Sequence, residues 1–361
     1  MALNTVSSDR LSTNVKTSNL GTELSKKVGQ NKNLIINGAM QVSARATSGS
    51  TAGGYPSLDR FYTFSNGLDE NPTMSQGSLT SSDTPFSSGF RKYLRFQNGN
   101  QTSGAGASDQ TWFRQGIEAQ NVAQSGWNYT SSSSFITLSF WIRASVAQTY
   151  YGFLKAPDGS NYLYPFSMAL SANTWTKVTK SIPGNSNLAF DNDTGLGLEV
   201  GIYAYLGTSL TDNSVSLDAW AAYSSGTTRT PDHTTTWYTT NDSTIDMTGV
   251  QLEVGSVATD FEFRSAEQEI QLCKRYFQAQ RPYYNAAQYL ITNEVASNTV
   301  FFNPEMRATP TATHETLSCR ENSDSFANVS VSSNYLLDSK GINYVVTKTG
   351  AATSDSFIIF V

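Results

Sequence analysis

The sequence predicts an all-β fold: a jelly-roll-like antiparallel sandwich, one linking α-helix, a second small β module and an extended N-terminal arm. Two observations predict the sheets. Many segments of the 361-residue chain alternate apolar and polar residues, and clusters rich in Gly, Pro, Asn and Asp separate these segments. A third observation predicts the helix, because one segment of the globular part repeats its apolar residues at helical spacing. Alternating strands without interposed helices favour antiparallel sheets packed face to face.

Two long segments alternate most clearly. In 135–144, Ile136 and Phe140 share one predicted face with Leu138 and Ile142, while Trp141 lies on the other. In 196–206, the leucines and Ile202 are expected inside, and Tyr203 and Tyr205 outside. In 244–254 the phase shifts at Gly249, which predicts a β-bulge. Further strands are expected in 34–42, 60–64, 90–97, 148–156, 162–170 and 174–182, and after the helix in 288–295, 298–303, 311–318, 327–333, 342–348 and 356–361.

The predicted helix covers 265–278. Ser265 and Gln268 form a capping box, which satisfies two amide groups at the helix start. Acidic residues in the first turn and basic residues near the end match the helix dipole. Ile270, Cys273 and Phe277 follow Ala266 on one apolar stripe, and they are candidates for an oligomer interface. The predicted divisions are an arm over 1–32, a sandwich over 33–262, a linking segment over 263–282 and a β domain over 283–361.

The composition excludes several classes of function. Charged residues make up 15% of the chain and its net charge is −5 without a basic run, which argues against nucleic acid or an anionic membrane as a partner. No apolar stretch reaches the length of a membrane span, so we expect no membrane insertion. The start of the chain lacks the pattern of a signal peptide, which predicts synthesis in the cytoplasm. The two cysteines, Cys273 and Cys319, are expected to be free thiols.

No motif indicates catalysis or a cofactor. The chain contains no nucleophile elbow, phosphate-binding loop or zinc-protease helix, so no catalytic residue, cofactor or metal site is predicted. His233 and His314 have no ligand-type residues at suitable spacing. The acidic residues, Asp59 and Asp246 among them, are expected to be scattered over the surface. The segment 191–195, DNDTG, offers oxygens for a hard cation, but a polar β-turn is the favoured interpretation.

The arm differs from the rest of the chain. Residues 1–32 contain no aromatic side chain, and Leu20, Leu24 and Val28 repeat every four residues. One interpretation is a solvated leader with a nascent helical turn, since short helices are marginal on their own. The other is an attachment arm that becomes ordered on a neighbouring protein, with these three residues as the contact.

Four stretches carry a resemblance to a known family. They are NLIINGAMQVSARAT at 33–47, LDRFYTF at 58–64, TGVQLEVGSVATDFEFRSAEQEIQLCKRYFQ at 248–278 and FFNPEMRATPTATHETL at 301–317. The chain resembles bacteriophage tail-fibre and related virion appendage proteins. This resemblance implies a structural protein of the virion with a carbohydrate-binding-like sandwich, assembled as a homotrimer, and no named catalytic residue. It also implies contacts with other virion proteins, for which the N-terminal arm is the candidate. Head decoration or cement protein, and tail-associated polysaccharide depolymerase, remain as alternatives.

Aromatic side chains are the candidates for contact with a host surface glycan. Flat rings stack on the apolar faces of sugars, while neighbouring amides and hydroxyls bond the sugar hydroxyls. The alternative for each ring is that it fills the core or an interface between subunits. The residues chosen are Trp141, Tyr203, Tyr205, Trp220, Trp237 and Tyr238.

Overall fold

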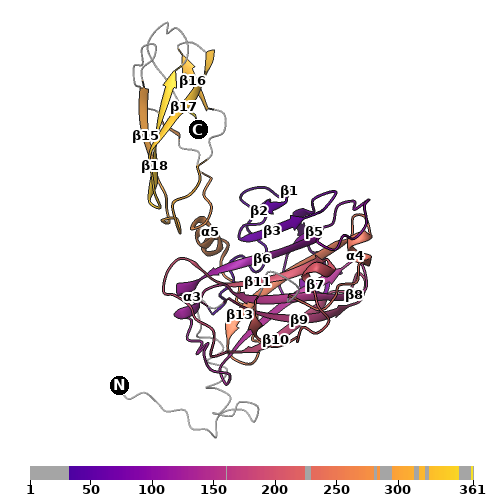
Figure 1. Cartoon of the computed structure of the whole chain (residues 1–361). Coiled ribbons are helices and arrows are strands. Elements are labelled where there is room, and N and C mark those ends of the chain that lie inside the picture. Colours follow the sequence, from indigo (N-terminus) through magenta and orange to yellow (C-terminus); the bar gives the residue numbers. More distant parts are fainter. Residues whose placement is uncertain are drawn as a thin grey trace, which may run out of the picture.

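The computed structural model describes residues 32–159, 161–223, 229–279, 283–284, 295–312, 317–321, 325–348 and 359–360. The predicted attachment residues Leu20, Leu24 and Val28 lie outside these ranges. The described residues form three antiparallel sheets (Figure 1). This confirms the predicted fold class of antiparallel β-structure with one linking helix. Sheets A and B pack into the sandwich, and sheet C belongs to the C-terminal module.

Sheet A forms one layer of the sandwich. Its order is β1 (Ser48–Ser50), β4 (Thr73–Ser78), β5 (Lys92–Gln97), β13 (Thr244–Val254), β7 (Phe135–Ala144) and β10 (Thr176–Pro183). Sheet B forms the other layer, in the order β12 (Ala221–Ala222), β9 (Tyr162–Leu170), β8 (Gln148–Ala156), β11 (Leu196–Leu206), β6 (Gln110–Glu118), β3 (Phe61–Asn66) and β2 (Gly53–Gly54). The chain passes repeatedly from one sheet to the other, as in a jelly roll.

Sheet C contains β14 (Tyr283–Tyr284), β19 (Ile359–Phe360), β16 (Leu317–Glu321), β17 (Ser325–Leu337), β18 (Gly341–Lys348) and β15 (Val295–Phe301), in that order. Helical turns in the described residues are α2 (Thr84–Ser87), α3 (Ala119–Ala123), η2 (Thr208–Leu210), α4 (Thr236–Thr239) and α5 (Ala266–Lys274). Figure 1 shows α5 at the point where the chain leaves the sandwich for sheet C. None of the helices in the described ranges is long and apolar enough to cross a membrane.

The core lies between sheets A and B. The predicted inner face of β7, formed by Ile136, Leu138, Phe140 and Ile142, is almost completely buried and belongs to one cluster with residues of sheet B such as Phe113. The bulge predicted at Gly249 is also present: this residue has φ +66°, and the pairing of β13 with β7 shifts between Thr248 and Gln251. Two strands, β8 and β9, have the bounds that the alternation predicts.

Two local predictions are wrong, and two strands were missed. Residues 34–42 are not a strand, because the Asn37 side chain bonds the backbone of Val42 and Asp59 and holds a turn with φ +61°. The helix has its capping box but ends at Lys274, where the Tyr276 amide bonds the carbonyl three residues earlier, at Cys273, instead of following the α-helical spacing of four. Strands β4 and β6 were not predicted.

Candidate functional site

Most of the aromatic residues chosen from the sequence lie in the core. Tyr203, Tyr205, Trp237 and Tyr238 are buried, with exposed fractions of 0–4%, so their ring faces are occupied by protein. The register of β11 with β6 shifts between Tyr203 and Tyr205, which places Tyr205 in the main core cluster and Leu206 in the cluster around Tyr203. The predicted outward orientation is therefore wrong for Tyr205, whereas Tyr203 lies on the outer face, where it pairs with Trp112, but is covered by other side chains. Asp59 and Asp246, expected on the surface, are buried as well.

Two of the aromatic residues chosen from the sequence remain partly exposed to solvent. Trp141 is half-buried and packs against the cluster of Tyr93 and Trp175 on the outer face of sheet A. Trp220 is half-buried, and its indole Nε1 donates to the Pro183 carbonyl at 2.7 Å. The chosen residues therefore do not form one site. In the helix segment, Ile270 is 41% exposed, Cys273 is buried as a free thiol, and Phe277 lies beyond the end of α5.

A different set of rings forms a partly exposed strip on the outer face of sheet B. We call it the aromatic strip: Tyr55, Tyr62, Phe64 and Trp112. Tyr62 and Phe64 alternate with buried residues along β3, and Phe64 pairs across the sheet with Trp112 of β6. Their ring centroids are 5.1 Å apart in a stacked arrangement, and Tyr55 meets Tyr62 edge to face at 5.3 Å.

Polar groups lie beside the aromatic strip. The Arg114 guanidinium is 5.0 Å from the centroid of Tyr62 and forms a 2.8 Å ion pair with Glu199. The Gln110 amide oxygen accepts hydrogen bonds from Trp112 Nε1 at 3.4 Å and from Arg229 at 2.7 Å. Apolar ring faces bordered by hydrogen-bonding groups suit a ligand that itself has apolar faces and polar edges.

The sequence contained a signal for this strip. The pattern of β3 places Phe61 inside and Tyr62 and Phe64 outside, and the pattern of β6 places Phe113 inside between Trp112 and Arg114. Two outward-facing aromatics on one short strand favour a covering segment or a ligand. That alternation identifies the faces, but the pairing of β3 with β6 depends on residues about fifty positions apart and could not be read locally.

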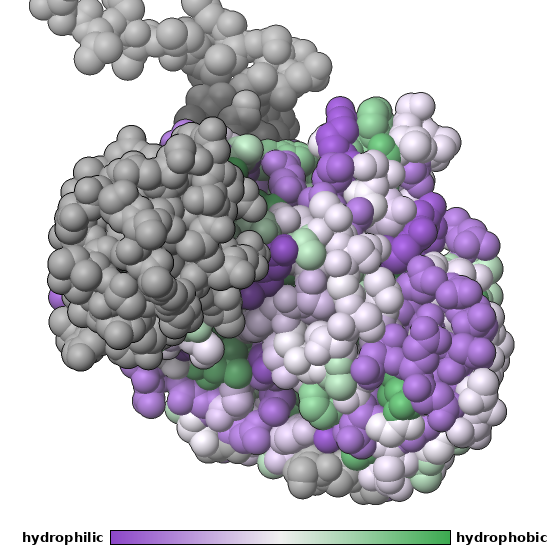
Figure 2. All heavy atoms as spheres, turned by 90° about the horizontal axis from the view of Figure 1, so that it is seen from above, coloured by the Kyte–Doolittle hydropathy of each residue, from purple (hydrophilic) through white to green (hydrophobic). Residues whose placement is uncertain are grey.

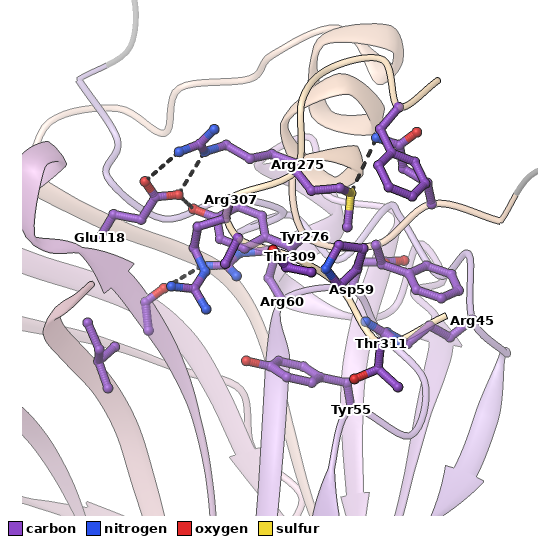
Figure 3. A pocket seen from close by; sticks show the side chains of 18 of the residues that line it. Arg45, Tyr55, Asp59, Arg60, Glu118, Arg275, Tyr276, Arg307, Thr309 and Thr311 are labelled. Atoms are coloured by element: carbon purple, nitrogen blue, oxygen red, sulfur yellow. Dashed lines mark hydrogen bonds and ion pairs between the residues drawn. The ribbon is translucent and has the colours of Figure 1, made fainter. Parts of the chain in front are cut away.

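A cleft of about 730 Å³ opens beside the aromatic strip, between the sandwich, the end of α5 and residues 300–312 (Figure 3). We call it the arginine cleft. Tyr55 and Arg114 line it as well, so strip and cleft are continuous. Its wall contains five arginines and two carboxylates: Arg45, Arg60, Arg114, Arg275, Arg307, Asp59 and Glu118.

One ion pair closes the upper side of the arginine cleft in Figure 3. Arg275 donates to both oxygens of Glu118, at 2.8 and 2.9 Å, and Tyr276 donates its hydroxyl to the same carboxylate. Burial raises the pKa of Glu118, but the hydrogen bonds of Arg275 and Tyr276 and the charge of Arg275 outweigh it, so the pKa lies below its usual value. Burial raises the pKa of Tyr276 to about 12. Glu118 is therefore an ionised structural partner.

The other arginines of the cleft stack on rings or bond carbonyl groups. Arg60 lies 3.3 Å from the centroid of Tyr276, and Arg45 lies 3.8 Å from that of Phe277. Arg307 donates to the Thr194 carbonyl at 2.8 Å, which joins the C-terminal module to the sandwich. Burial raises the pKa of Asp59, although a backbone hydrogen bond and the charges of Arg45 and Arg60 oppose the rise.

The segment 191–195 is a polar turn. The Asp193 carboxylate accepts the Gly195 amide at 2.7 Å, and its carbonyl accepts the Gln120 amide at 2.9 Å. Within the ranges that the structure describes, no group of three or more His, Cys, Asp and Glu is arranged to hold a metal ion.

Comparisons with known proteins add little. No protein family model matches the sequence, and no curated protein matches it significantly. Among solved structures, the enzymatically active domain of bacteriophage CBA120 tailspike protein 4 is similar at 9% identity with a TM-score of 0.32, over 62% of this chain and 22% of that one. A family 4 carbohydrate-binding module is similar at 11% identity with a TM-score of 0.30, over 61% of this chain and 98% of the module. A putative sugar-binding protein from Bacteroides thetaiotaomicron is similar at 12% identity with a TM-score of 0.32, over 62% of this chain and 100% of that protein. At these TM-scores the likeness carries no functional information.

Proposed function

We propose that this chain is a non-catalytic glycan-binding protein, and that it binds sugars on the aromatic strip. The observation that supports this most is the row of partly exposed rings on sheet B, with Trp112 at its centre and arginine and amide groups at its edge. A soluble sheet face that only contacts water needs no such row. Figure 2 shows that hydrophilic and weakly polar residues cover much of the visible sandwich surface, and that hydrophobic residues occupy small separate areas.

A glycan array tests the proposal. Wild-type protein is expected to bind a subset of the immobilised glycans, and Trp112→Ala is expected to lose about 5- to 150-fold in affinity, because stacking contributes about 1–3 kcal/mol per ring. Tyr129→Ala is the matched control, since Tyr129 is also half-buried but packs against Trp127 and Phe190 elsewhere. Binding that survives Trp112→Ala and is lost in Trp141→Ala would move the site to sheet A.

We further propose that the protein belongs to a phage virion, as a tail fibre or another appendage that adheres to the host surface. Support comes from the four stretches that resemble such proteins. Quantitative mass spectrometry of purified particles should find the chain at a fixed copy number, and particles assembled with a chain lacking residues 1–28 should contain none. Normal incorporation of the truncated chain would refute the attachment role of Leu20, Leu24 and Val28.

If the protein were a depolymerase instead, a different assay result would be expected. A catalytic protein would release new reducing ends from the polysaccharide that it binds, whereas an adhesin would bind the same material without change. The two assays, performed on one polysaccharide preparation, therefore distinguish adhesion from hydrolysis. We expect binding without release.

A further inference from the structure

We infer that the arginine cleft binds an acidic group of the glycan, a sugar carboxylate, while the neighbouring sugars lie on the aromatic strip. This inference rests on the proposed function, and it specifies the class of glycan. Three independent features of the cleft support it: its excess of positive charge, the state of Arg60, and its continuity with the strip.

The excess of positive charge is local. The whole chain is acidic, with a net charge of −5, yet the wall of this cleft has five arginines and two carboxylates. Arg275 is neutralised by Glu118, and Arg114 by Glu199. Arg45 and Arg60 share the field of one buried carboxylate, Asp59, and the hydrogen bond of Arg307 goes to a neutral carbonyl. An anion entering the cleft would therefore meet uncompensated guanidinium charge.

Arg60 is the least usual of these residues. It is 7% exposed, its φ is +77°, and its Nε has no hydrogen-bond partner within the described part of the chain. Its Nη2 donates to the Gly116 carbonyl, and its guanidinium stacks on Tyr276, so that the group is held in one orientation. Strained backbone and unsatisfied buried donors both cost free energy, and they concentrate where a ligand completes the site.

Arg114, which lies between the aromatic strip and the arginine cleft, shares one feature with Arg60. Its Nε is buried and also lacks a partner among the described residues, while its guanidinium lies over Tyr62 of the aromatic strip. Arg60 and Arg114 both line the cleft, and the guanidinium group of each has a buried donor without a partner among the described residues. Arginine binds carboxylates through paired N–H groups, with stronger hydrogen bonds than neutral donors make.

The size of the cleft agrees with this chemistry. A volume of about 730 Å³ lies in the range of pockets for small ligands, and so exceeds what one ordered water or inorganic anion needs. Figure 3 shows Arg45, Arg60 and Arg307 around the same hollow, with Tyr55 below them. A glycan chain stacked on the strip could therefore place one acidic residue among the arginines.

The competing explanation is that the arginines only hold the two modules together. In that case their substitution would lower stability without changing which glycans bind. A test must therefore compare acidic glycans with neutral partners of the same backbone.

The probes are matched glycans on one array: polyuronates, the same chains after carboxyl reduction, and sulfated chains with their desulfated forms. The proteins are the wild type, Arg60→Gln, Arg307→Gln and, as a control of equal charge change, Arg91→Gln, which lies outside the cleft and bonds carbonyls of its own loop. Thermal unfolding checks each fold. Arg307 is exposed, so its variant keeps the test valid if Arg60→Gln does not fold.

We expect the wild type to prefer carboxylated chains over their reduced forms by about tenfold or more, as a charged hydrogen bond implies. Both cleft variants should lose this preference and keep the affinity for reduced chains, whereas Arg91→Gln should behave as the wild type. Equal binding of carboxylated and reduced chains, or a preference unchanged in both cleft variants, overturns the inference and leaves the proposed function intact. Binding of sulfated chains alone overturns the carboxylate assignment. No binding to any of these chains by a wild type that binds other glycans overturns the inference, whereas no binding to any glycan on either array refutes the proposed function itself.

Discussion

Glu118 shows how a single buried carboxylate can join two parts of the chain. Its side chain is 2% exposed, and it accepts two hydrogen bonds from Arg275 and one from Tyr276, both just beyond the end of α5. Removing the charge leaves a guanidinium facing a neutral amide. Glu118→Gln should therefore lower the free energy of unfolding by about 2 kcal/mol at pH 7, since hydrogen bonds to charged groups contribute about 1.5–3 kcal/mol.

The pH dependence of this effect has a definite sign. The folded-state pKa of Glu118 lies below its ordinary value of 4.5, so the stabilisation is fully present above pH 4.5 and is lost as the pH falls through the folded-state pKa. Urea unfolding of wild type and Glu118→Gln from pH 7 to pH 3 should show a difference that shrinks at the acid end. A constant difference across this range would contradict the assignment.

A substitution of Trp237 should lower the stability of the fold without changing its affinity for glycans. It is fully buried, stacks on Phe96 with centroids 6.3 Å apart, and belongs to the main core. Trp237→Ala should cost about 3–5 kcal/mol in unfolding free energy, as large core truncations do. The folded fraction should keep the glycan affinity of the wild type, which titration calorimetry can measure. A specific loss of affinity with normal stability would return Trp237 to the list of binding residues.

Among the elements, β13 owes its shape to one glycine. Gly249 has φ +66°, and a Cβ at this position would lie 2.6 Å from the ring of Phe90. The bulge turns Val250 toward residues 33–38: its amide donates to the Gly38 carbonyl at 2.9 Å, and its carbonyl accepts the Asn33 side chain at 3.1 Å. The N-terminal segment is thereby fixed along β13.

Gly249→Ala should therefore destabilise the sandwich. The left-handed backbone conformation and the collision with Phe90 together should cost about 1–3 kcal/mol. Gly126→Ala is a suitable control, because Gly126 also has a positive φ of +85° but nothing lies near its missing Cβ. Chemical denaturation should show the larger loss for Gly249→Ala. Equal losses would mean that the backbone conformation alone sets the cost.

Two of the stretches that resemble virion appendage proteins, 33–47 and 248–278, meet in one polar junction around α5. Arg264, with a side chain 6% exposed, bonds the carbonyls of Asn33 and Ile35 and pairs with Glu269 at 3.2 Å. Glu269 also accepts the Asn37 amide at 2.6 Å. These residues, distant in sequence, therefore hold the helix on the sandwich. The same stretches also contain residues of the arginine cleft and of the aromatic strip, among them Arg60, Tyr62 and Phe64.

At the scale of the molecule, the sequence predicted what depends on local patterns. The period of two gave β7, β8 and β9, the capping box gave the start of α5, and the broken phase at Gly249 gave the bulge. It did not predict which faces are covered. Tyr203 has an outward position but is buried by Phe153 and Leu206, with Leu210 and Tyr223 of a following loop beside them. The arginine cleft depends on side chains from Arg45 to Arg307, which only the complete fold brings together.

The chain is expected to assemble with copies of itself. The resemblance implies a homotrimer, in which several weak glycan contacts would act together. The structure narrows the proposed interface, because Cys273 packs inside its own chain and Phe277 lies beyond the helix, so only Ile270 of the three interface candidates is strongly exposed.

Size exclusion with light scattering should give three times the chain mass of 39.3 kDa, and Ile270→Asp should reduce it to one chain with an unchanged circular dichroism spectrum. Val257→Asp, an exposed apolar position outside the helix, should leave the assembly intact. A wild-type mass near 39.3 kDa would refute the trimer, and a trimer that tolerates Ile270→Asp would place the interface away from α5.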